Sequence, residues 1–148
     1  MIKSTLPLLD YVNTLFEDTM FDNCLLIASQ HVLETNFTMF QYFFKKGLQP
    51  KDTFLIGKCY STNGEILKKF KEKGVYVHPG STKYDSHLSF DEQFEEFIID
   101  LLNHIKNKKD LPRYDRVILL DDGGYLIYWA NNLLKGSKNL IGIEQTSS

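Results

Sequence analysis

Five short apolar runs alternate with amphipathic helical patterns along this chain, and this alternation constrains the fold more than any other feature. None of the runs contains a charged residue, which is typical of strands buried on both faces of a parallel sheet. We expect strands at residues 25–28, 53–56, 75–77, 117–120 and 139–143. We expect helices around residues 8–16, 38–46, 66–73, 89–109 and 126–134. The alternation predicts an α/β fold: a single doubly wound, mostly parallel five-stranded sheet, Rossmann-like or flavodoxin-like, with helices on both faces, in one domain over residues 1–148.

The composition is that of an ordinary folded domain. Of the 148 residues, 43% are hydrophobic and 24% charged, which excludes wholesale disorder and fibrous repeats. A net charge of −2 gives no electrostatic reason to expect a nucleic-acid partner. No apolar run approaches the roughly 20 residues that span a bilayer, and the N-terminus lacks signal-peptide features, so we expect no membrane association. Cys24 and Cys59 are too few for a disulfide scaffold, so we expect reduced thiols in a cytoplasmic protein.

Polar clusters follow the predicted strands, at the edge where doubly wound sheets bind ligands. His31 follows the first strand, close to a helix start, which suits a hydrogen-bonding or proton-transfer role. A simple helix N-terminal residue is the alternative. Ser61, Thr62 and Asn63 follow the second strand, where Ser61 or Thr62 could bind a ligand or cap the next helix.

The strongest local signal is Asp121-Asp122-Gly123-Gly124, after the fourth strand. Two adjacent carboxylates at the end of a buried strand are costly unless they meet donors or bind a ligand. The glycines allow the backbone to approach a ligand closely. Carboxylates that cap the following helix are the structural alternative.

Several motifs are absent. No Gly-x-Gly-x-x-Gly follows a predicted strand and there is no Walker loop. The four histidines and two cysteines have no metal-ligand spacing, so we expect no metal site. The polar residues 144–148 directly follow the last predicted strand, where we expect a boundary within a longer protein.

Four blocks, in order, resemble the N-terminal substrate-binding part of the S-adenosylhomocysteine hydrolase (adenosylhomocysteinase) family. The family's histidine in Leu-His-Met-Thr corresponds to His31 in Gln-His-Val-Leu, and its Phe-Ser-Thr-Gln-Asp to residues 60–64. Its Ile-Leu-Asp-Asp-Gly-Gly-Asp-Leu corresponds to residues 119–126, and its Glu-Glu-Thr-Thr-Thr to residues 144–148. The ordered set spans the chain from about Cys24 to its end.

The resemblance implies roles for particular residues. His31 and Asp122 would be catalytic, handling protons at the ribose of a nucleoside-like substrate such as adenosine or S-adenosylhomocysteine. The implied substrate-binding residues are Glu34, Thr35, Thr62, Asp121 and Gln145. The implied cofactor-binding residues are Thr146, Ser147 and Ser148.

The family reaction oxidises the ribose 3′-hydroxyl reversibly with NAD, then eliminates homocysteine and adds water. We therefore expect NAD only in a longer protein, with an NAD-binding domain after residue 148 and a homo-oligomer formed through that domain. This chain alone is expected to hold no cofactor.

Departures from the family pattern keep two alternatives open. Leu33, Tyr125 and Gln145 replace a family threonine, aspartate and glutamate, which is compatible with a catalytically degenerate nucleoside-binding or regulatory module. The other alternative is a flavodoxin-like signalling domain that holds Mg²⁺ on Asp121 and Asp122. The acidic pair of such domains usually follows the first strand, where this chain has Ala28-Ser29-Gln30.

Overall fold

The computed structural model describes residues 6–145 of the chain and confirms the predicted order of elements. The five strands are β1 (Cys24–Ser29), β2 (Thr53–Ile56), β3 (Tyr76–Val77), β4 (Arg116–Asp121) and β5 (Leu140–Glu144). The α-helices are α1 (Pro7–Asn13), α2 (Glu34–Lys45), α3 (Gly64–Lys73), α4 (Phe90–Lys108) and α5 (Tyr125–Leu133). Short 3₁₀ turns cover Pro50–Asp52, Pro79–Thr82 and Leu111–Arg113.

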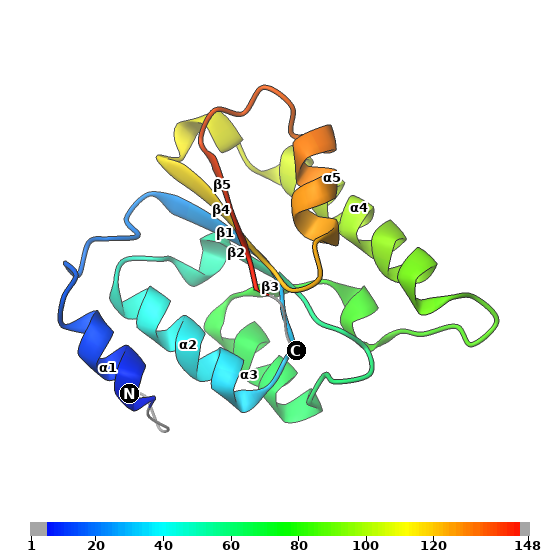
Figure 1. Cartoon of the computed structure of the whole chain (residues 1–148), viewed down its shortest axis with the longest axis horizontal. Coiled ribbons are helices and arrows are strands. Elements are labelled where there is room, and N and C mark those ends of the chain that lie inside the picture. The colour runs from blue at the N-terminus through cyan, green and yellow to red at the C-terminus, as the bar shows by residue number, and fades with distance from the viewer. Residues whose placement is uncertain (1–5, 146–148) are drawn as a thin grey trace.

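The strands form one sheet in the order β3-β2-β1-β4-β5, and every pair in it is parallel. Figure 1 shows the sheet nearly edge-on, with α2 and α3 on one side and α4 and α5 on the other. Alternate side chains of each strand enter two separate cores. Leu25 and Ile27 pack in the core with α4 and α5, whereas Leu26 and Ala28 pack in the core with α2 and α3. The doubly wound α/β fold is therefore confirmed.

The sheet has its topological switch point between β1 and β4. The chain leaves β1 towards α2 on one face and leaves β4 towards α5 on the opposite face (Figure 1). The turns that follow these two adjacent strands therefore diverge at the carboxyl edge of the sheet, which is where ligands bind in such folds.

The first two helices depart from the expected boundaries. α1 ends at Asn13 and buries no residue, so Leu15 and Phe16 lie beyond it and are exposed. A short helix gains most of its stability from packing an apolar face, and α1 has little to pack against. α2 begins at Glu34 rather than near Thr38, so His31 precedes the helix by three residues.

Helix capping corrects another expectation. Neither Ser61 nor Thr62 caps α3; the side chain of Asn63 does, accepting hydrogen bonds from the backbone N–H groups of Glu65 and Ile66. α3 begins at Gly64, so Asn63 stands just before the helix, the position from which a short polar side chain reaches the first free N–H groups. Ser89, at the predicted start of the fourth helix, caps α4 by accepting from the N–H of Glu92 at 3.1 Å.

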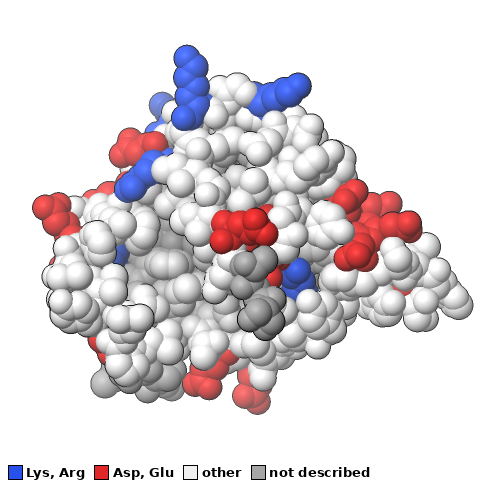
Figure 2. Space-filling view, viewed as in Figure 1, with Lys and Arg blue, Asp and Glu red and all other residues white. Residues whose placement is uncertain are grey.

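Charged side chains are unevenly distributed over the face drawn in Figure 2. Acidic side chains gather over the side of the molecule that α4 occupies, and the first turn of that helix carries Asp91 and Glu92. Basic side chains lie mainly along the upper edge, so this face has no continuous basic surface. Between residues 6 and 145, no helix is both long enough and apolar enough to cross a membrane.

Candidate functional site

Three polar side chains from three different strand ends meet at the carboxyl edge of the sheet. His31 follows β1, Ser61 follows β2 and Asp122 follows β4. We call these three residues the rim site. The predicted juxtaposition of His31 and Asp122 is confirmed: His31 Nε2 lies 3.3 Å from Asp122 Oδ2.

The imidazole of His31 has a polar partner at each ring nitrogen. Nδ1 lies 2.5 Å from the Ser61 hydroxyl oxygen, and Nε2 faces Asp122. A carboxylate beside Nε2 favours the tautomer that carries its proton there, which leaves Nδ1 to accept from the Ser61 hydroxyl. The side chain of His31 is 22% exposed and that of Asp122 is 11% exposed, so solvent reaches both.

The two adjacent aspartates point to different parts of the molecule. Asp121 ends β4 and is fully buried on the α5 side, where its Oδ2 accepts from the backbone N–H of Ile127 at 2.9 Å. Asp122 faces His31 instead, and its backbone N–H donates to the carbonyl of Ser29. Successive side chains of a strand point to opposite faces, which separates the pair. The geometry favours capping of α5, rather than substrate contact, as the role of Asp121.

The environment of Asp121 perturbs its ionisation. Burial raises the pKa of its carboxyl group, while hydrogen bonds from the backbone of Ile127 and Gly124 and the positive charge of Lys58 act in the opposite direction. Gly123 and Gly124, which lead into α5, have φ angles of +116° and +92°, conformations that favour glycine. These two glycines let the chain turn sharply enough for Asp121 to reach the N-terminus of α5.

Lys58 is a buried cation beside this site that sequence reasoning missed. Its Nζ lies 4.8 Å from the ring centroid of Phe94, a cation–π contact in the hydrophobic core between the sheet and α4. A methyl group added at Gly123 would lie 3.2 Å from the same Nζ. Lys58 follows the buried strand β2 by two residues, and this position is the sequence signal for its burial. A buried ammonium group needs an anionic or aromatic partner, so such a lysine marks a place where one should be sought.

The other predicted substrate-binding residues lie around the rim site. Thr62 is partly buried and its hydroxyl donates to the carbonyl of Lys58 at 2.8 Å. Glu34 and Thr35 open α2 and are exposed, three and four residues after His31. The backbone N–H of Gln145 donates to the Asp121 carbonyl at 2.7 Å, so Gln145 lies at the same edge, after β5. Their roles in binding stay predictions.

The predicted cofactor residues Thr146, Ser147 and Ser148 lie outside the described residues. Within residues 6–145, no group of three or more His, Cys, Asp or Glu side chains could hold a metal ion. Because Asp121 and Asp122 diverge, they also do not form the paired carboxylates that the Mg²⁺ alternative requires.

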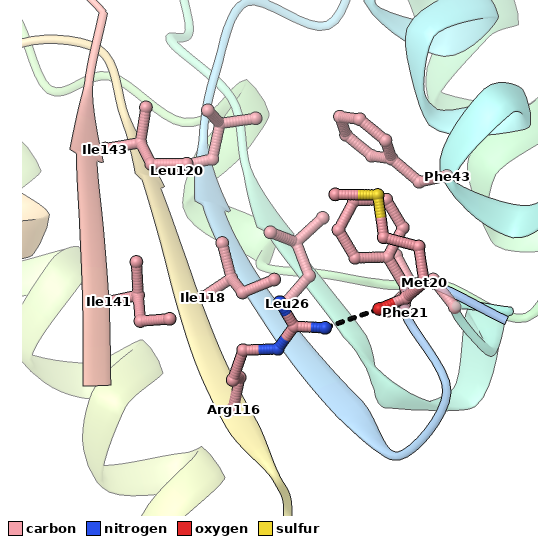
Figure 3. Close-up of a pocket in the computed structure, with 10 residues that line it drawn as sticks. Met20, Phe21, Leu26, Phe43, Arg116, Ile118, Leu120, Ile141 and Ile143 are labelled. Carbon is pink, nitrogen blue, oxygen red and sulfur yellow. Dashed lines mark hydrogen bonds between the residues drawn. The ribbon is translucent and has the colours of Figure 1, made fainter. Parts of the chain in front are cut away.

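A separate apolar groove of about 220 Å³ lies on the sheet face opposite α5. Figure 3 shows Ile141 and Ile143 of β5 and Ile118 and Leu120 of β4 facing towards Phe43 of α2. The one charged residue in its lining is Arg116, whose guanidinium donates to the carbonyl of Met20. The groove has no pair of acid and base groups, so it lacks the proton-transfer groups that the rim site has.

Comparison with known proteins adds two relatives without assigning an activity. The uncharacterized proteins MT0113 and Rv0104, from two strains of Mycobacterium tuberculosis, are each 38% identical to this chain over 145 residues. The match covers 98% of this chain but only 29% of each relative, so the chain spans less than a third of their length. No protein-family model matches the chain. This chain is therefore similar to one region of these much longer mycobacterial proteins.

Proposed function

We propose that this chain is a nucleoside-binding domain of an adenosylhomocysteinase-like, NAD-dependent protein, with the ribose hydroxyls of the ligand at the rim site. The observation that carries the proposal is the 3.3 Å approach of His31 Nε2 to Asp122 Oδ2 at the switch point of the sheet. These two residues belong to separate blocks of the family resemblance. Their approach supports that resemblance, because the resemblance requires both side chains to contact the same ribose.

The rim site has the groups that proton exchange with a hydroxyl requires. A ligand hydroxyl beside Ser61 can donate its hydrogen bond to His31 Nδ1, the position that the Ser61 hydroxyl contacts. Nδ1 then accepts the proton as a general base. The Asp122 carboxylate stabilises the imidazolium that forms, because it lies next to Nε2 on the far side of the ring. The Ser61 hydroxyl then gives up its contact with Nδ1 and hydrogen-bonds the incoming hydroxyl.

NAD belongs to this proposal only for a longer protein. The turn between β1 and α2 contains no glycine, so the described residues have no cradle for a pyrophosphate at the place where dinucleotide-binding sheets provide one. NAD would supply hydride transfer in such a protein. The cytoplasmic location and the homo-oligomer are likewise proposals, and the free thiols of Cys24 and Cys59 are consistent with the location.

Isothermal titration calorimetry of adenosine and S-adenosylhomocysteine with the chain tests the binding proposal. We expect binding to the unaltered chain and at least about tenfold weaker binding to His31→Asn and Asp122→Asn, because each loses a charge-assisted contact. His87→Asn is the matched control, since His87 is exposed in the loop before α4. Absence of binding to the unaltered chain would refute the proposal.

A catalytically degenerate binding module is the second candidate. Tyr125 stands at the first position of α5, where the family has an aspartate, which favours this candidate. The two candidates differ in turnover. Hydrolysis of S-adenosylhomocysteine by a longer protein that contains this domain would exclude the degenerate module, and binding without turnover would support it.

A further inference from the structure

An exposed aromatic ring lies directly beside the rim site. Tyr60 is 66% exposed, and its ring centroid lies 5.9 Å from that of His31 in an edge-to-face arrangement. Tyr60 also immediately precedes Ser61, whose hydroxyl contacts His31 Nδ1. A ligand whose hydroxyl binds His31 Nδ1 therefore lies next to the Tyr60 ring.

The exposed ring is held in position by a stack of aromatic side chains. Tyr60 contacts Phe90 edge-to-face at 5.2 Å between centroids, and Phe90 stacks on Phe94 at 5.4 Å with an interplanar angle of 16°. Phe94 is buried in the core between the sheet and α4. This contact series connects an exposed ring to the rigid core. A braced tyrosine offers a large contact area at a low cost in conformational entropy.

The phenol of Tyr60 is also held in its neutral form. Partial burial raises the pKa of the Tyr60 hydroxyl, and the negative charge of Asp122 raises it further. A neutral ring offers its π face to a flat heteroaromatic ring without adding a negative charge beside the carboxylate of Asp122.

We infer that Tyr60, braced by Phe90 and Phe94, is the stacking platform for the planar base of the ligand. The inference rests on the proposed function, because it takes the hydroxyl-bearing sugar to be held at His31. The rim site would contact the sugar of the ligand, and Tyr60 would contact its base. The ligand class is accordingly one with a planar ring next to a polyhydroxylated group, and a sugar alone would lack half of the contacts.

The test is a titration of adenosine into the unaltered chain and into three tyrosine variants, followed by calorimetry and by proton NMR of the adenine ring. Tyr60→Ala should weaken adenosine binding by roughly 5- to 150-fold, the range found for loss of one base-stacking ring. It should also abolish the upfield shift of the adenine H2 and H8 resonances on binding. Tyr60→Phe should keep both the affinity and the shift, because it keeps the ring.

Tyr128→Ala is the matched control, since Tyr128 is a 59% exposed tyrosine on α5 that contacts Trp129 rather than His31. It should bind adenosine as the unaltered chain does. Adenosine binding that is unchanged in Tyr60→Ala, or equally weakened in Tyr60→Phe, would overturn the inference and leave the proposed function standing. Failure of the unaltered chain to bind adenosine would overturn both.

Discussion

Two imidazole–carboxylate pairs in this molecule differ in which partner is exposed to solvent. In the rim site the imidazole of His31 is partly exposed, and its acid, Asp122, is mostly buried. In the second pair His78 is buried, while its acid, Asp100 of α4, is 72% exposed. The second pair is the closer one, with His78 Nε2 at 2.6 Å from Asp100 Oδ2 against 3.3 Å in the rim site. Proximity to a carboxylate alone therefore does not identify a functional histidine.

The decisive difference is the group that contacts the other ring nitrogen. In His78, Nδ1 accepts from the backbone N–H of Gly80 at 2.9 Å, which fixes the tautomer with a donor that no ligand can replace. In His31, Nδ1 faces the Ser61 hydroxyl, which can rotate and can also accept a hydrogen bond. The comparison indicates that His78 closes the turn after β3, whereas His31 is available for exchange with a ligand hydroxyl.

Alanine at His78 should give the largest loss of stability, and alanine at His31 a small one. His78→Ala should lower the free energy of unfolding by about 2–4 kcal/mol, because it leaves the Gly80 N–H without its acceptor and removes the packing of the ring on Phe97. His31→Ala should lower it by less than about 1 kcal/mol, since this ring is partly exposed. Urea denaturation measures both. Equal losses in the two variants would contradict the distinction between the pairs.

The two adjacent aspartates differ in the same way: Asp121 stabilises α5, whereas Asp122 belongs to the rim site. Asp121→Ala should lower the free energy of unfolding by about 1–3 kcal/mol, because α5 loses its cap and the N–H of Ile127 loses its acceptor. Asp122→Ala should cost less and should weaken adenosine binding instead. Denaturation midpoints and calorimetry on the two variants measure this, and a greater loss of stability in Asp122→Ala would reverse our assignment.

The raised pKa of Asp121 predicts a pH dependence. Since burial raises the pKa in the folded chain, the folded chain holds this proton more firmly than the unfolded chain does. The associated stability is fully present below about pH 4, the unfolded value, and is lost as pH rises through the folded pKa. The stability of Asp121→Asn relative to the unaltered chain should thus rise as pH rises across this window. Unfolding curves from pH 3.5 to 7 that stay parallel would contradict this.

Removal of the exposed acid should give the smallest effect. Asp100→Ala should lower stability by less than about 1 kcal/mol, and the difference should shrink at high salt, because the Asp100 carboxylate is largely solvated. Denaturation at low and at high ionic strength measures this. A loss as large as that of His78→Ala would show that the carboxylate, not the Gly80 N–H, holds the His78 ring.

Much of the fold could be predicted from local pattern. The predicted range of β2 matches residues 53–56 of the structure. The third predicted helix ends at residue 73, as α3 does, and Gly74 follows it with φ +102°. A short uncharged apolar run favours a strand buried on both faces, as β2 is, and glycine alone adopts such φ angles cheaply, so both signals act within a few residues. The start of α2 lies before the predicted one because residues 34–36 are polar and do not extend the apolar stripe on which the prediction rests.

The sequence by itself determined the doubly wound sheet and the edge at which its polar groups would gather. Only the tertiary structure decided how those groups are paired: Ser61 with His31 across 30 residues, Asp121 with α5 rather than with a ligand, and Tyr60 beside the rim site. The reason is that secondary structure follows from interactions between near neighbours, whereas these contacts depend on strand register and on the paths of three separate turns. A few ångströms of difference in any one of those turns would give the same strands and a different site.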